Sequence, residues 1–550
     1  MKKIRKVVTL LLAIMMVLSL AACNNGGGGG ETPDPSQGGG IKDTFTYAIG
    51  GEPSSMDPGN AGDSVTAYVT NQAFFGLYHI GPDGSMVADA AKDLQISDDG
   101  LTYTFTLLDT KWSDGQPVVA GDYVYGVKHS LSLETADCGY QSYIYDFIVG
   151  AEQYAHNGTK AADMTDLGVE APDDHTLIYH LTKPCPYFTS LLSISIYYPV
   201  RADFAVDGDT SWANNPAVPT SGAYYFTDID KADHISLKKN PYFVYADKVV
   251  TENLEAKVVE DMDAQLIQFK SGQIDFASAV DATVVTHDPE IADSIIVTGA
   301  INYYMNVNAY GGNEALANRD VRRALQLGID RELLATALDA EGVYYPLSSF
   351  LPDGMPGING DWNDEAGTLV YNDYEEAKQL LAKAGYDTPD AEGYVLTLNY
   401  SYNASTMHST IADVITSEYK KIGVKIVQET AELRTFFSNR SNGDFELARN
   451  AFSADYMDPT TFLELMLYRT ATTHTQGDEV YDAMLDEASK MTGDERLQKL
   501  HDAEKYAIEE QCFNIPLLGY GTANLVKPTT TGYTTSPQAN EFFWYVSCAE

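Results

Sequence analysis

The spacing of hydrophobic and polar residues predicts strands and helices along the chain. Residues 101–112, LTYTFTLLDTKW, alternate apolar and polar positions and predict a strand, and residues 173–181 predict another that opens at a turn. Between residues 319 and 338, apolar side chains recur at helical spacing, which predicts a helix. Residues 374–386 predict an amphipathic helix that ends at Gly385.

The same alternation continues towards the C-terminus. Strands are predicted at 395–403 and 424–430, around a helix at 408–422. Residues 207–222 are rich in turn-forming residues and predict a long loop. A chain of 550 residues is too long for one core, so the pattern indicates two to four domains with α/β lobes.

The N-terminus has the pattern of an export signal. Basic residues 2–6 precede a 14-residue, largely apolar run at 7–20, which is too short to span a bilayer. The run ends in LAAC, which resembles the lipobox where lipoproteins are cleaved before a cysteine that receives a lipid. We therefore expect a signal peptide at 1–22, lipidation of Cys23 and a Gly-rich tether at 23–40. A plain signal peptide with a chance cysteine is the alternative.

These features predict an extracytoplasmic protein held at the membrane by its lipid. The lipobox and the long tether favour the surface of a Gram-positive cell over a periplasm. The formal charge is −43, from 78 acidic and 35 basic residues. Such a chain repels phosphate backbones, so we expect no nucleic-acid partner.

Four further cysteines follow Cys23. They form no CxxC or zinc pattern. Proximity in sequence favours the disulfides Cys138–Cys185 and Cys512–Cys548, and four free thiols are the alternative.

The sequence shows no catalytic machinery. It lacks the HExxH, GxSxG and P-loop motifs and a GxGxxG that opens a helix, and its ten histidines never take ligand spacing on one helix face. Residues 228–233, DIDKAD, lack the Gly and the terminal Glu of a calcium loop and predict a solvated turn. We expect no cofactor, no metal and no enzymatic activity.

A segment near the C-terminus suggests binding instead. Arg449 and Asp455 lie at the two ends of a mostly apolar run. If the segment is extended, alternate side chains from 449 to 455 share one face, and the backbone of 451–453 can pair with a ligand strand. A short zwitterion would match the two charges. A buried internal ion pair, or two unrelated surface charges, is the alternative.

Ten blocks of sequence, in order, resemble the bacterial extracellular solute-binding proteins of the peptide/nickel type, family 5. The resemblance runs from about residue 45 to 535 and is most like the oligopeptide-binding lipoproteins of ABC transporters. Its most specific blocks are DGLTYTFTLLDTKWSDGQPVVAGDYVYGVK (99–128), NRDVRRALQLGIDRELL (318–334) and GDFELARNAFSADYMDPTTFL (443–463).

The resemblance implies an α/β fold of the periplasmic-binding-protein type, with two lobes, an extra inserted domain and a hinge between the lobes. Lobe I would comprise 41–62, 197–298 and 511–550, the inserted domain 63–196, and lobe II 299–510. Short peptides would bind between the closing lobes, and permease subunits would receive them from a monomeric carrier.

The resemblance also assigns roles to single residues. Asp455 would bind the peptide amine, and Arg449, Arg440 and His408 would receive the carboxylate of ligands of different length. Tyr140, Tyr520 and Tyr304 would touch the peptide. The two segments expected to pair with its backbone are Gly62, Asp63 and Ser64 on one edge and Ala451, Phe452 and Ser453 on the other.

Two other functions stay open on the same scaffold. One is a carrier of a non-peptide solute such as a nickel chelate or an oligosaccharide, against which Asp455 and Arg449 argue. The other is a surface protein that senses peptides without transport. Neighbouring genes for two permeases and two ATPases would favour transport.

Overall fold

One large sheet collects strands from nearly the whole chain. The computed structural model describes residues 40–81, 84–133, 140–311, 313–468, 477–538 and 541–549. Within the compact unit Ile41–Cys548, 11 of the described strands form this sheet. Its order is β10 (Tyr224–Asp230), β11 (His234–Lys239), β12 (Asn253–Val258), β1 (Thr44–Ile49), β13 (Phe276–Ala277), β19 (Asn514–Val526), β14 (Ile295–Val307), β18 (Leu447–Ser453), β16 (Leu396–Asn403) and β17 (Val424–Ala431), with β15 (Tyr344–Pro346) paired to β19.

A separate four-stranded sheet lies in the segment predicted as the inserted domain. Its order is β4 (Ala91–Ile96), β5 (Thr102–Leu107), β9 (Thr176–His180) and β8 (Val169–Asp173), and all of its pairs are antiparallel. Three two-stranded ribbons complete the described strands: β2 (Tyr78–Ile80) with β3 (Met86–Ala88), β6 (Thr110–Lys111) with β7 (Pro117–Val118), and β20 (Thr530–Thr531) with β21 (Ser547–Cys548).

The helices occupy the connections between strands. Most begin at an Asp, Asn or Ser whose side chain accepts a hydrogen bond from the first turn. They are α2 (Ser64–Ala73), α3 (Ala120–Ser132), α4 (Ser142–Tyr145), α5 (Phe188–Leu191), α6 (Met262–Lys270), α7 (Ala282–Val285), α8 (Glu314–Ala317), α9 (Arg319–Leu327), α10 (Arg331–Ala337), α11 (Trp362–Ala366), α12 (Tyr374–Lys383), α13 (Thr406–Lys421), α14 (Leu433–Asn442), α15 (Thr460–Leu463), α16 (Glu479–Ala488) and α17 (Gly493–Lys505).

Most predicted elements are confirmed, with three corrections. The first half of the turn predicted at 228–233 belongs to β10, which ends at Asp230 and pairs there with β11. The helix predicted at 319–338 is two helices, α9 and α10, because Asp330 caps a new helix by accepting from the Leu333 amide at 3.1 Å. The strand predicted at 101–112 is divided between β5 and β6, which belong to different sheets. Hydrophobic alternation runs through both, so it cannot reveal the break.

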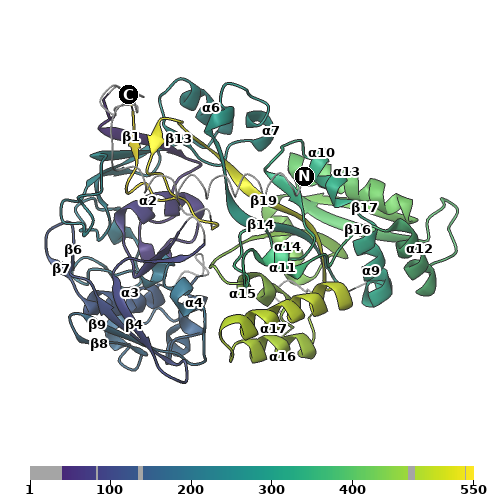
Figure 1. Ribbon diagram of the computed structural model, residues 1–550, viewed down its shortest axis with the longest axis horizontal. Helices are drawn as coiled ribbons and strands as arrows, with labels where there is room; N and C mark the ends of the chain where they lie inside the picture. Colours follow the sequence, from purple (N-terminus) through teal and green to yellow (C-terminus); the bar gives the residue numbers. More distant parts are fainter. Residues whose placement is uncertain are drawn as a thin grey trace, which may run out of the picture. The chain divides into compact units, whose positions relative to one another are not determined.

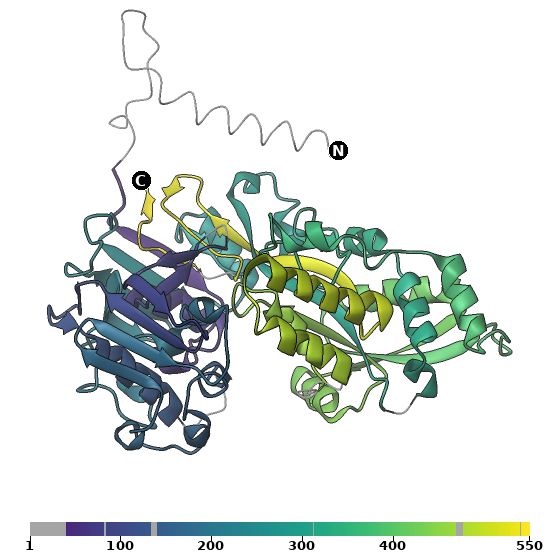
Figure 2. The ribbon, with the colours of Figure 1, turned by 60° about the horizontal axis from the view of Figure 1, so that its bottom comes forward.

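The two longest strands, β14 and β19, link both ends of the large sheet. They pair antiparallel from Ile295 opposite Leu525 to Asn306 opposite Asn514. β13 pairs with β19 near one end, and β18 pairs with β14 near the other. In Figures 1 and 2 these strands run from the purple and blue part of the chain into its green part, where α16 and α17 lie side by side. They form the structural connection on which a hinge would act.

The buried hydrophobic residues form separate cores in the earlier and the later part of the chain. One core collects side chains from residues 45–276 and from the C-terminal residues 526–548, and it also includes Tyr456. Two further cores form mainly from residues 300–518, on opposite sides of β14 and β18. Tyr456 is therefore an anchor of the later segment in the core of the earlier one.

The predicted disulfide Cys512–Cys548 is wrong. Cys512 Sγ donates to the Glu509 carbonyl at 3.6 Å, whereas Cys548 Sγ lies 3.8 Å from the Asp275 carboxylate. Neither sulfur bonds to the other, and both thiols are buried. Cys138, Cys23, the predicted signal peptide 1–22 and the tether up to residue 39 lie outside the described residues.

A buried carboxyl group joins the C-terminal segment to the two long strands. Asn524 of β19 donates to Glu541 Oε1 at 3.2 Å, Thr298 of β14 donates to the same oxygen at 3.4 Å, and the Tyr533 hydroxyl donates to Oε2. Burial raises the pKa of Glu541 to about 7, although the hydrogen bonds from Tyr533 and Thr298 act in the opposite direction. The folded protein therefore favours the neutral acid.

We expect Glu541 to make stability fall as pH rises from about 5 to 8. The unfolded chain releases this proton near its ordinary pKa, whereas the folded chain keeps it up to about pH 7, and the difference corresponds to about 3 kcal/mol. Glu541→Gln should remove this loss, measured as the change in urea midpoint between pH 5 and pH 8. Glu260→Gln, at an exposed position, is the control. Equal pH dependence in wild type and Glu541→Gln would contradict the assignment.

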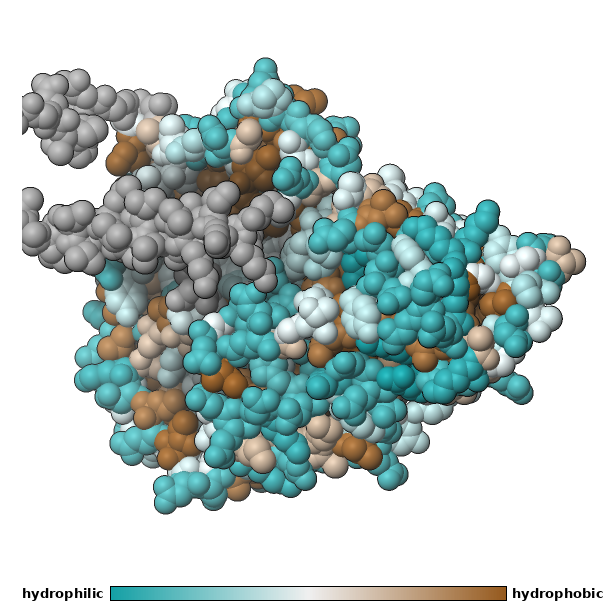
Figure 3. All heavy atoms as spheres, turned by 45° about the vertical axis from the view of Figure 1, so that its right-hand side comes forward, coloured by the Kyte–Doolittle hydropathy of each residue, from teal (hydrophilic) through white to brown (hydrophobic). Residues whose placement is uncertain are grey.

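The outer surface agrees with the acidic composition. On the face shown in Figure 3, hydrophilic side chains predominate and hydrophobic patches are separated by them. None of the described helices combines the length and apolar character needed to cross a bilayer. Within the described ranges, no three side chains of the metal-binding types gather into a cluster.

Candidate functional site

The segment singled out by the sequence forms β18 and the turn that follows it. β18 covers Leu447–Ser453, so the extended conformation is confirmed, but Asp455 lies beyond the end of the strand. The strand is buried at residues 447–450 and becomes accessible from Ala451 onwards. A continuous strand therefore passes from the core into an accessible region, with Arg449 near one end and Asp455 past the other.

One edge of β18 is open over its second half. β14 pairs with the other edge from Val307 opposite Leu447 to Ile301 opposite Ser453. β16 pairs only with Leu447 and Ala448, and after these two positions no described strand covers this edge.

The hydrogen bonds show which residues face the open edge. Ala454 donates its amide to the Ala300 carbonyl, and Glu446 accepts from Asn308, so even-numbered residues face β14. The odd-numbered residues therefore direct their backbone groups to the opposite edge. The Ala451 amide donates to the Asn450 side-chain oxygen at 3.0 Å. The Ala451 carbonyl and the backbone of Ser453 lie where an added strand could pair with them.

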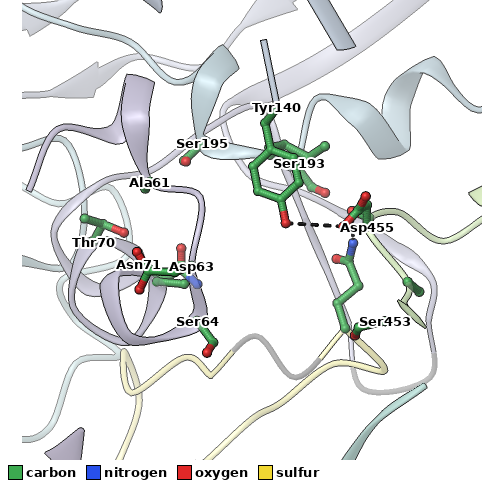
Figure 4. Close-up of a pocket in the computed structure, with 14 residues that line it drawn as sticks. Ala61, Asp63, Ser64, Thr70, Asn71, Tyr140, Ser193, Ser195, Ser453 and Asp455 are labelled. Atoms are coloured by element: carbon green, nitrogen blue, oxygen red, sulfur yellow. Dashed lines mark hydrogen bonds between the residues drawn. The ribbon is translucent and has the colours of Figure 1, made fainter. Parts of the chain in front are cut away.

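A cavity of about 250 Å³ adjoins the end of β18 (Figure 4). Five predicted residues line it: Asp63, Ser64, Tyr140, Ser453 and Asp455. Hydroxyl and amide side chains make up much of the remaining wall. Among the described residues that line it there are two carboxylates and no lysine, arginine or histidine. The cavity can therefore receive a cation.

Asp455 is the most constrained of these acids. Its Oδ1 accepts from the Tyr140 hydroxyl at 3.2 Å and its Oδ2 from the Tyr143 hydroxyl at 2.7 Å. Burial raises the pKa of the Asp455 carboxyl, whereas the two tyrosine hydrogen bonds lower it. A cationic group beside it would restore the ionised form. Arg449 does not supply that charge, because its hydrogen bond goes to Asn403.

Arg449 lies in a second group at the other end of the strand. It is buried, and its guanidinium donates to the Asn403 side-chain oxygen and lies over the rings of Phe436 and Phe437, 5.0 and 5.6 Å from their centroids. Arg440 donates to the Asn450 side-chain oxygen at 2.5 Å. In the part of the chain that the structure describes, both guanidinium groups bond to neutral oxygens.

The positive charges in this group affect one another. Burial lowers the pKa of Arg440, and the nearby Arg449 charge lowers it further. Burial and Arg449 together lower the pKa of His408 to about 4. Its Nδ1 lies 3.2 Å from the Tyr303 hydroxyl. Two like charges that face neutral partners form a site that an anion would stabilise.

The remaining predicted residues take other positions. Tyr520 on β19 lies opposite Tyr344, and the charge of Arg449 acts on its hydroxyl. Tyr304 is 1% exposed, and its hydroxyl accepts from Asn450 at 2.7 Å, so its ring lies in the core and does not line the cavity. Phe452 packs edge-on against Phe462, with ring centroids 5.6 Å apart.

The predicted strand at 62–64 needs correction. Asp63 caps α2 by accepting from the Thr66 amide at 2.8 Å, and Ser64 is the first residue of that helix. Gly62 belongs to the loop that leads into it. An aspartate before a helix accepts its first amide groups, and this local bonding competes with an extended ladder.

Sequence reasoning missed several contributors to the site. Tyr143, Asn403 and Tyr303 contact Asp455, Arg449 and His408, and the Gln538 side chain donates to the Asp455 carbonyl. Only Tyr143 could have been predicted from its neighbours in the sequence, because it follows Tyr140 by three residues, a spacing that places both side chains on one side of a helical turn. The others come from distant segments.

Comparison with known proteins identifies relatives over most of the chain. A family described as "Bacterial extracellular solute-binding proteins, family 5 Middle" matches residues 85–474. The chain is 31% identical over 503 residues to the periplasmic oligopeptide-binding protein OppA of Escherichia coli K12, covering 90% of each protein. It is 26% identical over 501 residues to the probable deoxycholate-binding periplasmic protein YgiS of the same strain, covering 89% of this chain and 90% of that protein.

A solved structure supports the same relationship. The unliganded open form of MppA, a periplasmic murein tripeptide-binding protein, has a TM-score of 0.77 and 26% identity, covering 93% of this chain and 99% of that one. The predicted two-lobed α/β fold is confirmed by this likeness.

Proposed function

Because the chain belongs to family 5 of the bacterial extracellular solute-binding proteins, we propose that it binds short peptides and supplies them to the permease of an ABC importer. The peptide lies along the open edge of β18, with its amine at Asp455 and its carboxylate towards Arg449. The names of the oligopeptide-binding and murein tripeptide-binding relatives support this class of ligand.

The observation that carries the proposal is the order of features along one strand. A buried acid, in a cavity whose described lining has no cation, is followed by an open backbone edge and then by Arg449, with Arg440 of α14 nearby; both arginines bond to neutral oxygens. A peptide has the complementary order of amine, backbone and carboxylate. Pairing through the backbone accepts any side chain, which suits a carrier of mixed peptides.

The amine end supplies the stronger requirement. An ammonium group placed at Asp455 is removed from water, and a buried charge without its partner costs about 3–5 kcal/mol. Tyr140 donates to the Asp455 carboxylate, and Ser453 and Gln538 are among the other polar residues that line the cavity there. A ligand without a free amine would leave the Asp455 charge uncompensated.

The carboxylate end allows a range of ligand lengths. Residues 449 and 455 are six positions apart, which is about 20 Å along a straight strand and less where the chain turns after Ser453, so an extended ligand can have up to about six residues. Arg449, Arg440 and His408 act as the receiving set, either directly or through water. The charge of Arg449 acts on the Tyr520 hydroxyl, although the backbone of Tyr520 lies opposite Ile301, which pairs with Ser453.

The cellular setting is part of the proposal. Cys23 carries the lipid anchor, the Gly-rich tether 23–40 holds the binding unit near the membrane, and the protein acts as a monomer outside a Gram-positive cell. No catalytic step is involved, and the permease subunits are its protein partners.

A non-peptide ligand is the second candidate, and the YgiS relative is the observation that favours it. A bile-acid-like ligand carries a carboxylate and no amine, so it could use Arg449 and Arg440 but not Asp455. The acidic cavity at Asp455 therefore favours the peptide.

The proposal predicts that a free amine decides binding. Trialanine should bind at least tenfold more tightly than N-acetyl-trialanine, because the acetylated ligand places no charge beside Asp455. The measurement is isothermal titration calorimetry on protein freed of copurified ligand, with native mass spectrometry before that step to identify what is bound. Copurified short peptides would support the proposal. Equal affinity for the two tripeptides, or a single non-peptide mass, would contradict it.

A further inference from the structure

We propose that Tyr143 is a positioning residue for peptide recognition. Its hydroxyl fixes one oxygen of Asp455 and leaves the other for the amine of the ligand. This inference rests on the proposed function and assigns a role to a residue that does not line the cavity.

The two tyrosines that bond Asp455 differ in position. Tyr140 lines the cavity, and its hydroxyl lies 3.2 Å from Asp455 Oδ1. Tyr143 is absent from the described lining, and its hydroxyl lies 2.7 Å from Oδ2. The shorter bond therefore belongs to the tyrosine behind the wall, and the longer bond to the one that faces the ligand. An ammonium group can approach Oδ1 while Tyr143 keeps Oδ2.

Tyr143 is itself held firmly. The Tyr197 hydroxyl, fully buried, donates to the Tyr143 carbonyl. The Tyr143 ring packs edge-on against Tyr456, with centroids 5.6 Å apart and an angle of 87° between the planes, and it stacks against Tyr140 at 6.0 Å. Tyr456 directly follows Asp455 and stacks on Tyr187 at 4.9 Å. Tyr143 thus bonds one residue and packs against the next, which fixes the turn as a unit.

The bond crosses between segments far apart in sequence. Tyr143 lies on α4, in the predicted inserted domain, whereas Asp455 belongs to the predicted lobe II. Formation of the bond therefore requires the two segments to be together. Tyr456, which directly follows Asp455, packs in one core with Tyr187 and Tyr197, so the turn that carries Asp455 is held against the segment that carries Tyr143.

Tyr143 acts as a donor at every relevant pH. Burial and the Asp455 charge raise the pKa of its phenol far above the usual range, so it keeps its proton. The described titratable groups around the pair include Tyr140, Asp63 across the cavity, and Glu464, whose charge also acts on Tyr143. Tyr456 packs against the Tyr143 ring, and the Tyr197 hydroxyl donates to the Tyr143 carbonyl. Removal of this donor leaves the carboxylate less stabilised, so its pKa rises.

The test is Tyr143→Phe, which keeps the ring and removes only the hydroxyl. Tyr145→Phe is the matched control, because Tyr145 lies on the same helix and its ring packs against His156 at 5.4 Å. Calorimetric titration with trialanine from pH 5 to pH 8 gives the affinity profile, and thermal unfolding confirms that the variants fold.

Tyr143→Phe should bind trialanine about tenfold more weakly at pH 7, as expected for a lost bond to a charged group. Its affinity should also begin to fall at a higher pH on acidification than that of wild type or Tyr145→Phe. Wild-type affinity would overturn the inference, and so would a uniform loss with an unshifted profile, which is the mark of a merely structural role. If wild type itself does not prefer trialanine over N-acetyl-trialanine, the proposed function fails instead.

Discussion

Asp455→Asn is expected to weaken trialanine binding at least tenfold while the protein folds normally. The substitution keeps the shape of the side chain and removes its charge. The amine of the ligand then loses its ion pair in a cavity whose described lining contains no cation and whose only other carboxylate, Asp63, is occupied in capping α2. Hydrogen bonds to charged groups contribute about 1.5–3 kcal/mol, which corresponds to a loss of about tenfold or more.

The control for this measurement is Asp387→Asn, which removes one negative charge at an exposed position. It separates the local contact from the long-range effect of a charge of −43 on a cationic group. Calorimetry at two salt concentrations completes the design. An unchanged dissociation constant in Asp455→Asn would exclude this residue as the amine partner, whatever the ligand.

The second large effect is expected on stability. Asp458→Asn should reduce the free energy of unfolding by about 3–5 kcal/mol, because it leaves the Arg496 guanidinium buried without its counter-ion. Both nitrogens of Arg496 donate to Asp458 at 2.7 Å, and the two side chains are 5% and 10% exposed. The guanidinium also lies over the Tyr187 ring, 5.4 Å from its centroid.

Urea unfolding measures the loss of stability, and two further variants test whether the unpaired Arg496 charge causes it. The double variant Asp458→Leu with Arg496→Met should recover much of the loss, because a buried ion pair replaced as a whole often costs little. Lys378→Met removes a solvent-exposed ion pair with Glu375 and should change stability little. A small effect of Asp458→Asn alone would show that solvent reaches Arg496 and compensates its charge.

Much of the fold could be predicted from local sequence signals. Gly385 ends α12 with a positive φ of 93°, and the strands and helix from 395 to 431 lie within two residues of their expected bounds. These signals depend on neighbours in the chain. The break at Asp330 was missed because hydrophobic spacing continued through it, although the cap residue itself was visible.

The site could be predicted only in part. Asp455, Arg449 and the strand residues between them lie in one segment of the chain. Their spacing in the sequence is therefore enough to predict that they lie along one extended stretch. The partners that define their chemistry are Tyr143, Asn403 and Gln538, which come from three distant parts of the chain. Tyr304 was expected in the groove, but a tyrosine on a strand can face either side, and the register of β14 with β18 places it in the core.

The open half of β18 has a consequence beyond recognition. A strand edge with unpaired backbone groups is also a template on which other chains, including a second copy of this one, can add and aggregate. Here the accessible stretch is limited to residues 451–453, β16 pairs with Leu447 and Ala448 on that edge, and a cavity wall with two carboxylates adjoins its end. The short length and the negative charge restrict what can add to this edge. The geometry proposed to admit one small peptide would therefore also limit self-association of the unoccupied protein.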